Sequence, residues 1–144
     1  MKKLITTLLI VIVAIVIGCG SSNGNGNGIK HKTPKDIATE LYDCFAKGDI
    51  DGFIDKLVDN MSSESKKSIT NEEKYKEEMA KEVKKALGKG FQKKLEEFGG
   101  KLNFEVEERI DGDKAEVFIK MQGNDGQPQI MEFVKEDGKW KIAE

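Results

Sequence analysis

The hydrophobic pattern of this 144-residue chain changes its period once, near Leu102. Before that residue, apolar side chains recur every three or four positions, which predicts amphipathic helices. After it, apolar and polar side chains alternate, which predicts β-strands. Helices followed by a run of strands predict an α+β fold, in which the N-terminal helices pack on one face of an antiparallel sheet.

Local signals mark where the helices begin and break. Residues 33–36 predict a helix start, with threonine as the N-cap, proline in the first turn and an acid three residues after the cap. Asp49 is placed to cap a second helix, and residues 70–73 predict a capping box at the start of a third, longer one. Gly88 and Gly90 interrupt the apolar stripe of that third helix, which predicts a kink or a split there.

The second half of the chain predicts four strands separated by glycine-containing turns. They cover residues 102–109, 115–121, 130–134 and 140–143. Residues 61–68, which are rich in serine and lysine, are predicted to form an irregular connection between helices.

The N-terminus has the pattern of an export signal. Lys2 and Lys3 precede a mostly apolar run over residues 4–17, which is shorter than the about 20 residues that a membrane-spanning helix needs. The run ends in Val-Ile-Gly-Cys, which resembles the lipobox of bacterial lipoproteins. Cleavage between Gly18 and Cys19, with acylation of the nucleophilic Cys19 thiol, is therefore expected. The alternative is a short uncleaved anchor, and both place the rest of the chain on the non-cytoplasmic side of a membrane.

Three segments follow from these signals. Residues 1–18 are predicted as a lipoprotein signal peptide, residues 19–33 as the lipidated cysteine and a flexible Gly/Asn/Ser linker, and residues 34–144 as one α+β domain. The 14 residues after Cys19 have a random-coil reach of roughly 20 Å. The expected location is the cell envelope, with the membrane as a partner through the N-terminal lipid.

Both ends of the predicted domain carry a resemblance to a known superfamily. The motifs are Thr-Pro, Tyr, Phe and Lys-Gly-Asp between residues 33 and 49, and Lys-Glu-Asp-Gly-Lys-Trp-Lys-Ile at residues 135–142. With the order of elements, they resemble the nuclear-transport-factor-2-like (cystatin-like) superfamily, especially its small bacterial lipoproteins of unknown function, some labelled lumazine-binding-like. The resemblance implies a curved sheet that wraps the helices into a cone able to hold a small ligand, and a homodimer through the sheet. Enzymes of this superfamily place an Asp, Tyr or His in the cone.

Few side chains are candidates for a ligand site in such a cone. Tyr42, Tyr75 and Trp140 could orient a ligand, although each could equally serve as a core residue. No catalytic residue is predicted, because the only histidine, His31, lies in the linker. Cys44, the other cysteine, is predicted to be a buried core thiol.

Charge is distributed unevenly along the chain. The total of 24 basic and 26 acidic residues excludes a strongly basic nucleic-acid binder, so no nucleic-acid partner is expected. Residues 66–101 carry a formal charge of +4, whereas residues 34–65 and 102–144 carry −5 each. The basic helix either keeps the domain soluble or contacts anionic headgroups or cell-wall polymers. The lysines predicted for that contact are Lys84, Lys85, Lys89, Lys93 and Lys94.

No metal or cofactor is expected. Asp51, Asp55 and Asp59 share one helix face at a spacing of four residues, which could form a weak cation site. A solvated acidic face is the favoured interpretation, because the ligand spacing of a calcium loop is absent.

The sequence favours a non-enzymatic, lipid-anchored envelope protein that binds a small molecule or an envelope partner protein. The alternative function is a cone-type enzyme of the isomerase or dehydratase class, and a third possibility is a structural spacer. A buried titratable pair at the base of the cone would distinguish the enzyme from the binding module.

Overall fold

The computed structural model describes residues 32–123 and 126–143. The predicted signal peptide, its cleavage site at Gly18 and Cys19, and the linker up to residue 31 lie outside these described residues. Within them, no helix is both long and apolar enough to cross a membrane. The elements are α2 (Pro34–Ala46), α3 (Ile50–Asp59), α4 (Ser63–Lys66), α5 (Glu72–Glu97), β1 (Phe104–Asp111), β2 (Lys114–Met121), β3 (Gln129–Glu136) and β4 (Lys139–Ile142).

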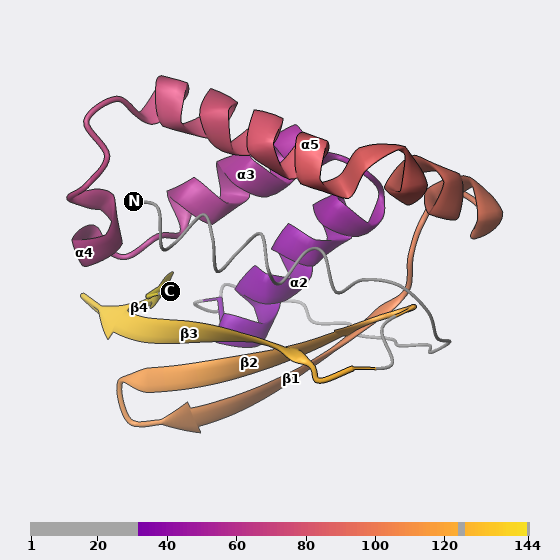
Figure 1. Cartoon of the computed structure of the whole chain (residues 1–144). Helices are drawn as coiled ribbons and strands as arrows, with labels where there is room; N and C mark the ends of the chain where they lie inside the picture. The colour runs from indigo at the N-terminus through magenta and orange to yellow at the C-terminus, as the bar shows by residue number, and fades with distance from the viewer. Residues whose placement is uncertain (1–31, 124–125, 144) are drawn as a thin grey trace.

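The four strands form one open antiparallel sheet in the order β1-β2-β3-β4. Figure 1 shows α2, α3 and α5 together on one face of this sheet, which we call the inner face. The opposite, outer face is covered by none of the helices that the structure describes. The predicted α+β class, with an antiparallel sheet packed against helices on one side, is confirmed.

The core lies between the inner face and the helices. Every second side chain of β2 is buried there, as the alternation of the sequence predicted. Phe45 of α2 joins the helices, because its ring centroid lies 5.4 Å from that of Phe53 on α3 and 5.2 Å from that of Phe91 on α5. Side chains from all three long helices and all four strands therefore share one apolar cluster.

One predicted helix cap is confirmed by the structure, and another lies one residue away from its predicted position. Thr33 caps α2 and forms a capping box with Asp36, as predicted. The predicted box at residues 70–73 is wrong by one position, because Asn71 caps α5 and accepts a hydrogen bond from the Lys74 backbone N–H. Asparagine is at least as good an N-cap as threonine, so the chain begins the helix one residue later.

The connection predicted to be irregular contains a short helix. Helix α4 begins after Ser62, whose hydroxyl accepts a hydrogen bond from the Ser65 backbone N–H. The preceding residues pair with β4: the Ser62 N–H donates to the Ile142 carbonyl, and the Ile142 N–H donates to the Asn60 carbonyl. This pairing is a single parallel bridge between Met61 and Ile142, so it covers only the end of the β4 edge, and the sequence pattern carried no signal for it.

The first strand begins two residues later than predicted. Leu102 is fully buried, but its backbone N–H donates to the Ala46 carbonyl at the end of α2 instead of to a strand. Strand β1 starts at Phe104, where pairing with Met121 of β2 begins. Tertiary contact with a helix therefore determines the conformation of Leu102.

Helix α5 is broken at Gly88, as the sequence predicted. Gly88 has φ 59° and ψ −166°, a backbone conformation essentially restricted to glycine. Gly90 lies two residues further on and remains helical. The residues after the break, including Phe91 and Leu95, still pack on the core.

Replacing Gly88 with alanine is expected to lower the free energy of unfolding by about 1–3 kcal/mol. A methyl group built at Gly88 meets nothing within 4 Å, so the loss would come from backbone strain and not from a clash. Gly90→Ala is the matched control, since its methyl group also has open space and should stabilise the helix by up to about 1 kcal/mol. Urea denaturation of both variants measures the change in the free energy of unfolding. If Gly88→Ala stabilised the protein as much as Gly90→Ala, the helix break at Gly88 would not be required for the fold.

Candidate functional site

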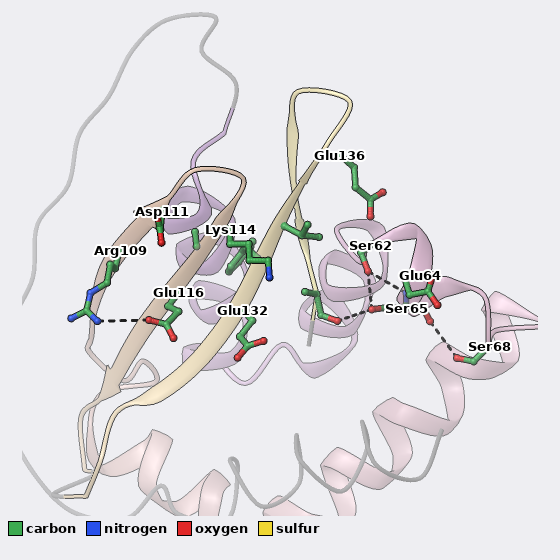
Figure 2. A pocket seen from close by; sticks show the side chains of 14 residues that line it. Ser62, Glu64, Ser65, Ser68, Arg109, Asp111, Lys114, Glu116, Glu132 and Glu136 are labelled. Carbon is green, nitrogen blue, oxygen red and sulfur yellow. Dashed lines mark hydrogen bonds and ion pairs between the residues drawn. The ribbon is translucent and has the colours of Figure 1, made fainter.

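A pocket of about 950 Å³ lies at one end of the domain. Figure 1 shows the β1–β2 turn and α4 at this end. Most of its strand residues belong to the outer face. Arg109 of β1, Glu116 of β2 and Glu132 of β3 are neighbours in the strand register. Glu116 and Glu132 alternate with buried side chains of their strands. Figure 2 shows these three side chains directed to the same side of the sheet. We call this site the outer-face pocket.

The lining of the outer-face pocket is polar and mostly acidic. Figure 2 shows it extending from β1 across β2 and β3 to α4. Its ionisable side chains comprise two bases and five acids, so the lining carries a formal charge of −3. The lining residues are Ser62, Glu64, Ser65, Ser68, Arg109, Asp111, Lys114, Ala115, Glu116, Glu132, Phe133, Val134, Glu136 and Ala143.

Two like charges face each other at the floor of the pocket. Glu116 and Glu132 are directly paired across β2 and β3, an arrangement that destabilises a sheet. Arg109 compensates only in part, because its guanidinium lies 3.9 Å from the Glu116 carboxylate and also stacks on the Phe118 ring, 5.5 Å from its centroid. The floor therefore attracts a further positive charge.

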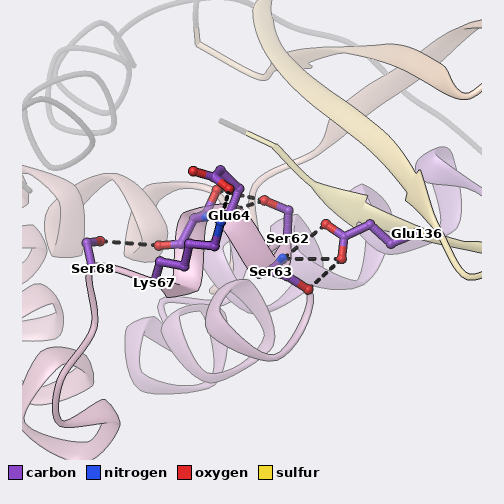
Figure 3. A network of polar contacts seen from close by, with 7 residues as sticks. Ser62, Ser63, Glu64, Lys67, Ser68 and Glu136 are labelled. Atoms are coloured by element: carbon purple, nitrogen blue, oxygen red, sulfur yellow. Dashed lines mark hydrogen bonds and ion pairs between the residues drawn. The ribbon is translucent and has the colours of Figure 1, made fainter.

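The wall made by α4 is held in place by serine hydroxyls. Figure 3 shows the Glu136 carboxylate at the start of α4, where it accepts hydrogen bonds from the Ser63 hydroxyl at 2.7 Å and the Ser63 backbone N–H at 3.0 Å. The Ser65 hydroxyl donates to the Ala143 carbonyl at 2.7 Å and lies 2.9 Å from the Ser62 hydroxyl. These bonds connect α4 to both ends of the β3–β4 hairpin.

The Ser63 contacts also make the wall sensitive to acid. Hydrogen bonds from the Ser63 hydroxyl, and then from its backbone N–H, lower the pKa of the Glu136 carboxyl. Because the pKa is lower in the folded state, the hydrogen bonds between ionised Glu136 and Ser63 stabilise the fold at any pH above the pKa of an unfolded glutamate. This stabilisation is lost as the pH falls through the lowered pKa. Acid is therefore expected to weaken the contact between Glu136 and α4, while the bond from Ser65 to Ala143 does not titrate.

The ionisable side chains of the pocket are open to solvent. The five acids of the lining are exposed or half-buried. In the described part of the chain, no group of three His, Cys, Asp or Glu residues is arranged to hold a metal ion. The groups of the pocket that could contact a ligand are carboxylates, two basic side chains and serine hydroxyls.

The structure places Tyr42 in the core, away from the outer-face pocket. Its hydroxyl donates a 2.6 Å hydrogen bond to the side-chain oxygen of buried Gln129. Its ring lies 5.8 Å from that of Phe53 and 6.2 Å from that of Phe104, measured between centroids. Burial raises the pKa of the Tyr42 phenol far above its usual value. These contacts give Tyr42 a structural role, and its predicted role in ligand binding stays a prediction.

The other two predicted ligand residues are also buried and lie apart from Tyr42. Tyr75 is in the first turn of α5, where burial raises the pKa of its phenol. Trp140 is on β4 and carries the Lys135 ammonium 5.4 Å from its ring centroid. No hydrogen bond or ring contact among the described residues joins any two of these three side chains. Their roles as ligand contacts stay predictions.

The acidic row of α3 has a role that its sequence spacing did not reveal. Asp51 accepts two hydrogen bonds from the Lys84 ammonium, at 2.8 and 2.9 Å. Asp55 and Asp59 lie 3.3 and 3.6 Å from the Lys76 ammonium. The row predicted to be merely solvated therefore remains exposed but also forms ion pairs with α5. Lys84, predicted to contact an anionic surface, is already paired.

The other lysines predicted for an anionic surface remain available. Lys85, Lys89 and Lys93 are exposed, Lys94 is half-buried, and no ion pair of the described residues involves them. Cys44, predicted to be a buried thiol, is a free cysteine and only partly buried against the core. Burial raises the pKa of its thiol.

The residues of the outer-face pocket were absent from the sequence-based prediction. Strand alternation places Arg109, Glu116 and Glu132 on polar faces, which is a usable signal. Their convergence depends on the register of three strands and on α4, whose position the sequence pattern did not indicate.

Helices on one face of an open antiparallel sheet, with an acidic pocket on the other face, define a small α+β domain. Residues 25–143 match the model of a family described as a domain of unknown function (DUF4878), and the chain belongs to this family. No curated protein matches the chain, and no solved structure matches it.

Proposed function

We propose that this protein is a lipid-anchored protein of the cell envelope, whose domain binds a small molecule in the outer-face pocket without chemical turnover. The observation that carries the proposal is the pocket, whose volume of about 950 Å³ is within the range of small-molecule sites. Its charge of −3 and the paired Glu116 and Glu132 favour a ligand with a cationic group. The anchor rests on the sequence around Cys19.

The finer identity of the domain is part of this proposal. Helices that precede a four-stranded antiparallel meander are in keeping with a nuclear-transport-factor-2-like domain. Between the helices and the inner face, however, buried and mostly apolar side chains form one cluster. This packing supports a site on the outer face over one between the helices and the sheet.

We propose a homodimer through the outer face as the quaternary state. Ile130, 52 % exposed, lies directly beside Phe118 on this face, and both are apolar. Four acids and two bases surround this pair, and a second copy turned by two-fold symmetry can oppose the two bases to acids. They are Glu105, Glu107, Glu116, Glu132, Arg109 and Lys120. Because Arg109 and Glu116 also line the pocket, such a dimer would cover part of the pocket floor.

Native mass spectrometry of the protein extracted from its own membrane tests the pocket and the dimer together. A bound small molecule is expected in the wild-type protein, and the double variant Glu116→Gln with Glu132→Gln is expected to lose it. The same variant should gain about 0.2–1 kcal/mol in stability, because two opposed carboxylates become neutral. The mass also reports whether the protein is monomeric or dimeric.

The matched control is Glu105→Gln with Glu107→Gln, which removes the same charge from the outer face beyond the pocket. This control is expected to keep the ligand. Equal ligand loss in both double variants, or a wild-type protein with no ligand, would overturn the pocket as the functional site. A ligand that is chemically altered on incubation would instead support the isomerase or dehydratase alternative.

A further inference from the structure

Helix α5 contains the most strongly basic stretch of the described chain. Between Val83 and Leu95 there are five lysines and no acidic residue, although the whole chain carries a net charge of −2. Asp51 pairs with the first of these lysines, Lys84. The other four have no ion-pair partner among the described residues, and they lie on or next to the part of α5 that follows the Gly88 break. They are Lys85, Lys89, Lys93 and Lys94.

An exposed apolar side chain ends this segment. Phe98, the C-cap of α5, is 39 % exposed, whereas Phe91 and Leu95 of the same segment are buried in the core. Unpaired lysines beside an exposed aromatic ring are what an anionic membrane interface binds. We call residues 85–98 the basic arm.

The basic arm and the outer-face pocket lie at opposite ends of the domain. Figure 1 shows the kinked end of α5 at one end, and α4 with the β1–β2 turn at the other. The pocket carries −3, whereas the arm carries +2, because Glu96 and Glu97 offset two of its four unpaired lysines, so an anionic surface attracts one end and repels the other. An anionic membrane surface would therefore favour one orientation of the domain.

The proposed tether is long enough to allow that orientation. The described chain enters the domain at α2, whose start lies beside β1, since the Lys35 backbone N–H donates to Glu108 at 2.9 Å. Helix α2 has 13 residues and is about 20 Å long. The reach of the linker, roughly 20 Å, is comparable. The arm can therefore reach the membrane that holds the lipid.

We infer that the basic arm docks on the anionic headgroups of the membrane that carries the lipid anchor, and so turns the outer-face pocket away from that membrane. This inference rests on the proposed lipid anchor. Each unpaired lysine near an anionic leaflet is worth roughly fivefold in surface affinity. Removing four of them should weaken docking on the order of a hundredfold or more.

The test uses the full lipidated protein reconstituted into vesicles of 30 % anionic lipid, with a headgroup quencher. A fluorophore on Gln92→Cys, in a Cys44→Ala background, reports the position of the arm, since Gln92 is exposed within it. Strong quenching is expected, with loss of quenching at high salt, on zwitterionic vesicles, and after Lys85, Lys89, Lys93 and Lys94 are changed to Gln. Flotation of the vesicles separately reports the lipid anchor.

The charge-matched control changes four lysines away from the arm to Gln and should leave quenching intact. They are Lys35, Lys66, Lys139 and Lys141. Failure to float would overturn the proposed anchor. Flotation with no quenching, or with quenching that the arm lysines do not affect, would overturn the docking inference alone. Quenching that requires an anionic cell-wall polymer in place of anionic lipid would also overturn it.

Discussion

Changing Cys19 to alanine is expected to leave the chain as an uncleaved precursor without lipid. The Cys19 thiol is the only group at the predicted cleavage site able to carry a thioether-linked lipid, and processing is expected to depend on that lipid. Two or more acyl chains, at about 0.8 kcal/mol per buried CH₂, make the anchor effectively permanent, so their loss is an all-or-none change. Intact-mass measurement of the membrane and soluble fractions detects it.

Cys44→Ala is the matched control, because it removes the only other cysteine. This variant should be cleaved and acylated like the wild-type protein, since Cys44 lies on α2 inside the folded domain. Normal cleavage of the Cys19→Ala chain, together with a wild-type protein that carries no lipid, would contradict the prediction. An uncleaved wild-type chain in the membrane would instead support the short permanent anchor.

Changing Tyr42 to phenylalanine is expected to lower the free energy of unfolding by about 1–3 kcal/mol. The substitution keeps the ring that packs against Phe53 but removes the donor of the 2.6 Å bond to Gln129. A buried amide oxygen then loses a partner that water does not replace. Thermal and urea denaturation measure the change.

Tyr75→Phe provides the comparison for Tyr42→Phe. The Tyr75 side chain is buried in the same core, but its hydroxyl makes no hydrogen bond to another described residue. Its removal should therefore change stability by less than about 0.5 kcal/mol. If Tyr42→Phe is as stable as the wild-type protein but loses a bound small molecule, Tyr42 is a ligand contact and the structural role assigned above is wrong.

Local physics accounts for what the sequence predicted well. The capping box of Thr33 and Asp36 involves residues three positions apart, and Gly88 disfavours a helix whatever surrounds it. Strand alternation likewise depends only on the order of side chains along one segment, and it identified the buried face of β2 correctly. These features hold before any distant part of the chain is placed.

The structural features that the sequence did not predict depend on contacts between segments that are distant in the chain. The sequence predicted Leu102 to be a strand residue, but in the structure its backbone N–H donates to the Ala46 carbonyl of α2. The acids of α3 were predicted to be solvated only, but α5 places Lys76 and Lys84 within ion-pair distance of them. Strand register, together with the short helix α4, assembled the outer-face pocket.

The sequence alone determined the α+β order of elements, the expected export signal and the basic stretch of α5, because each is written in consecutive residues. Only the tertiary structure decided that Tyr42 bonds to Gln129, 87 positions away, and that Glu116 opposes Glu132. Such pairs depend on how helices and strands pack. Many packings satisfy the same pattern of apolar and polar residues, so that pattern does not specify which distant side chains meet.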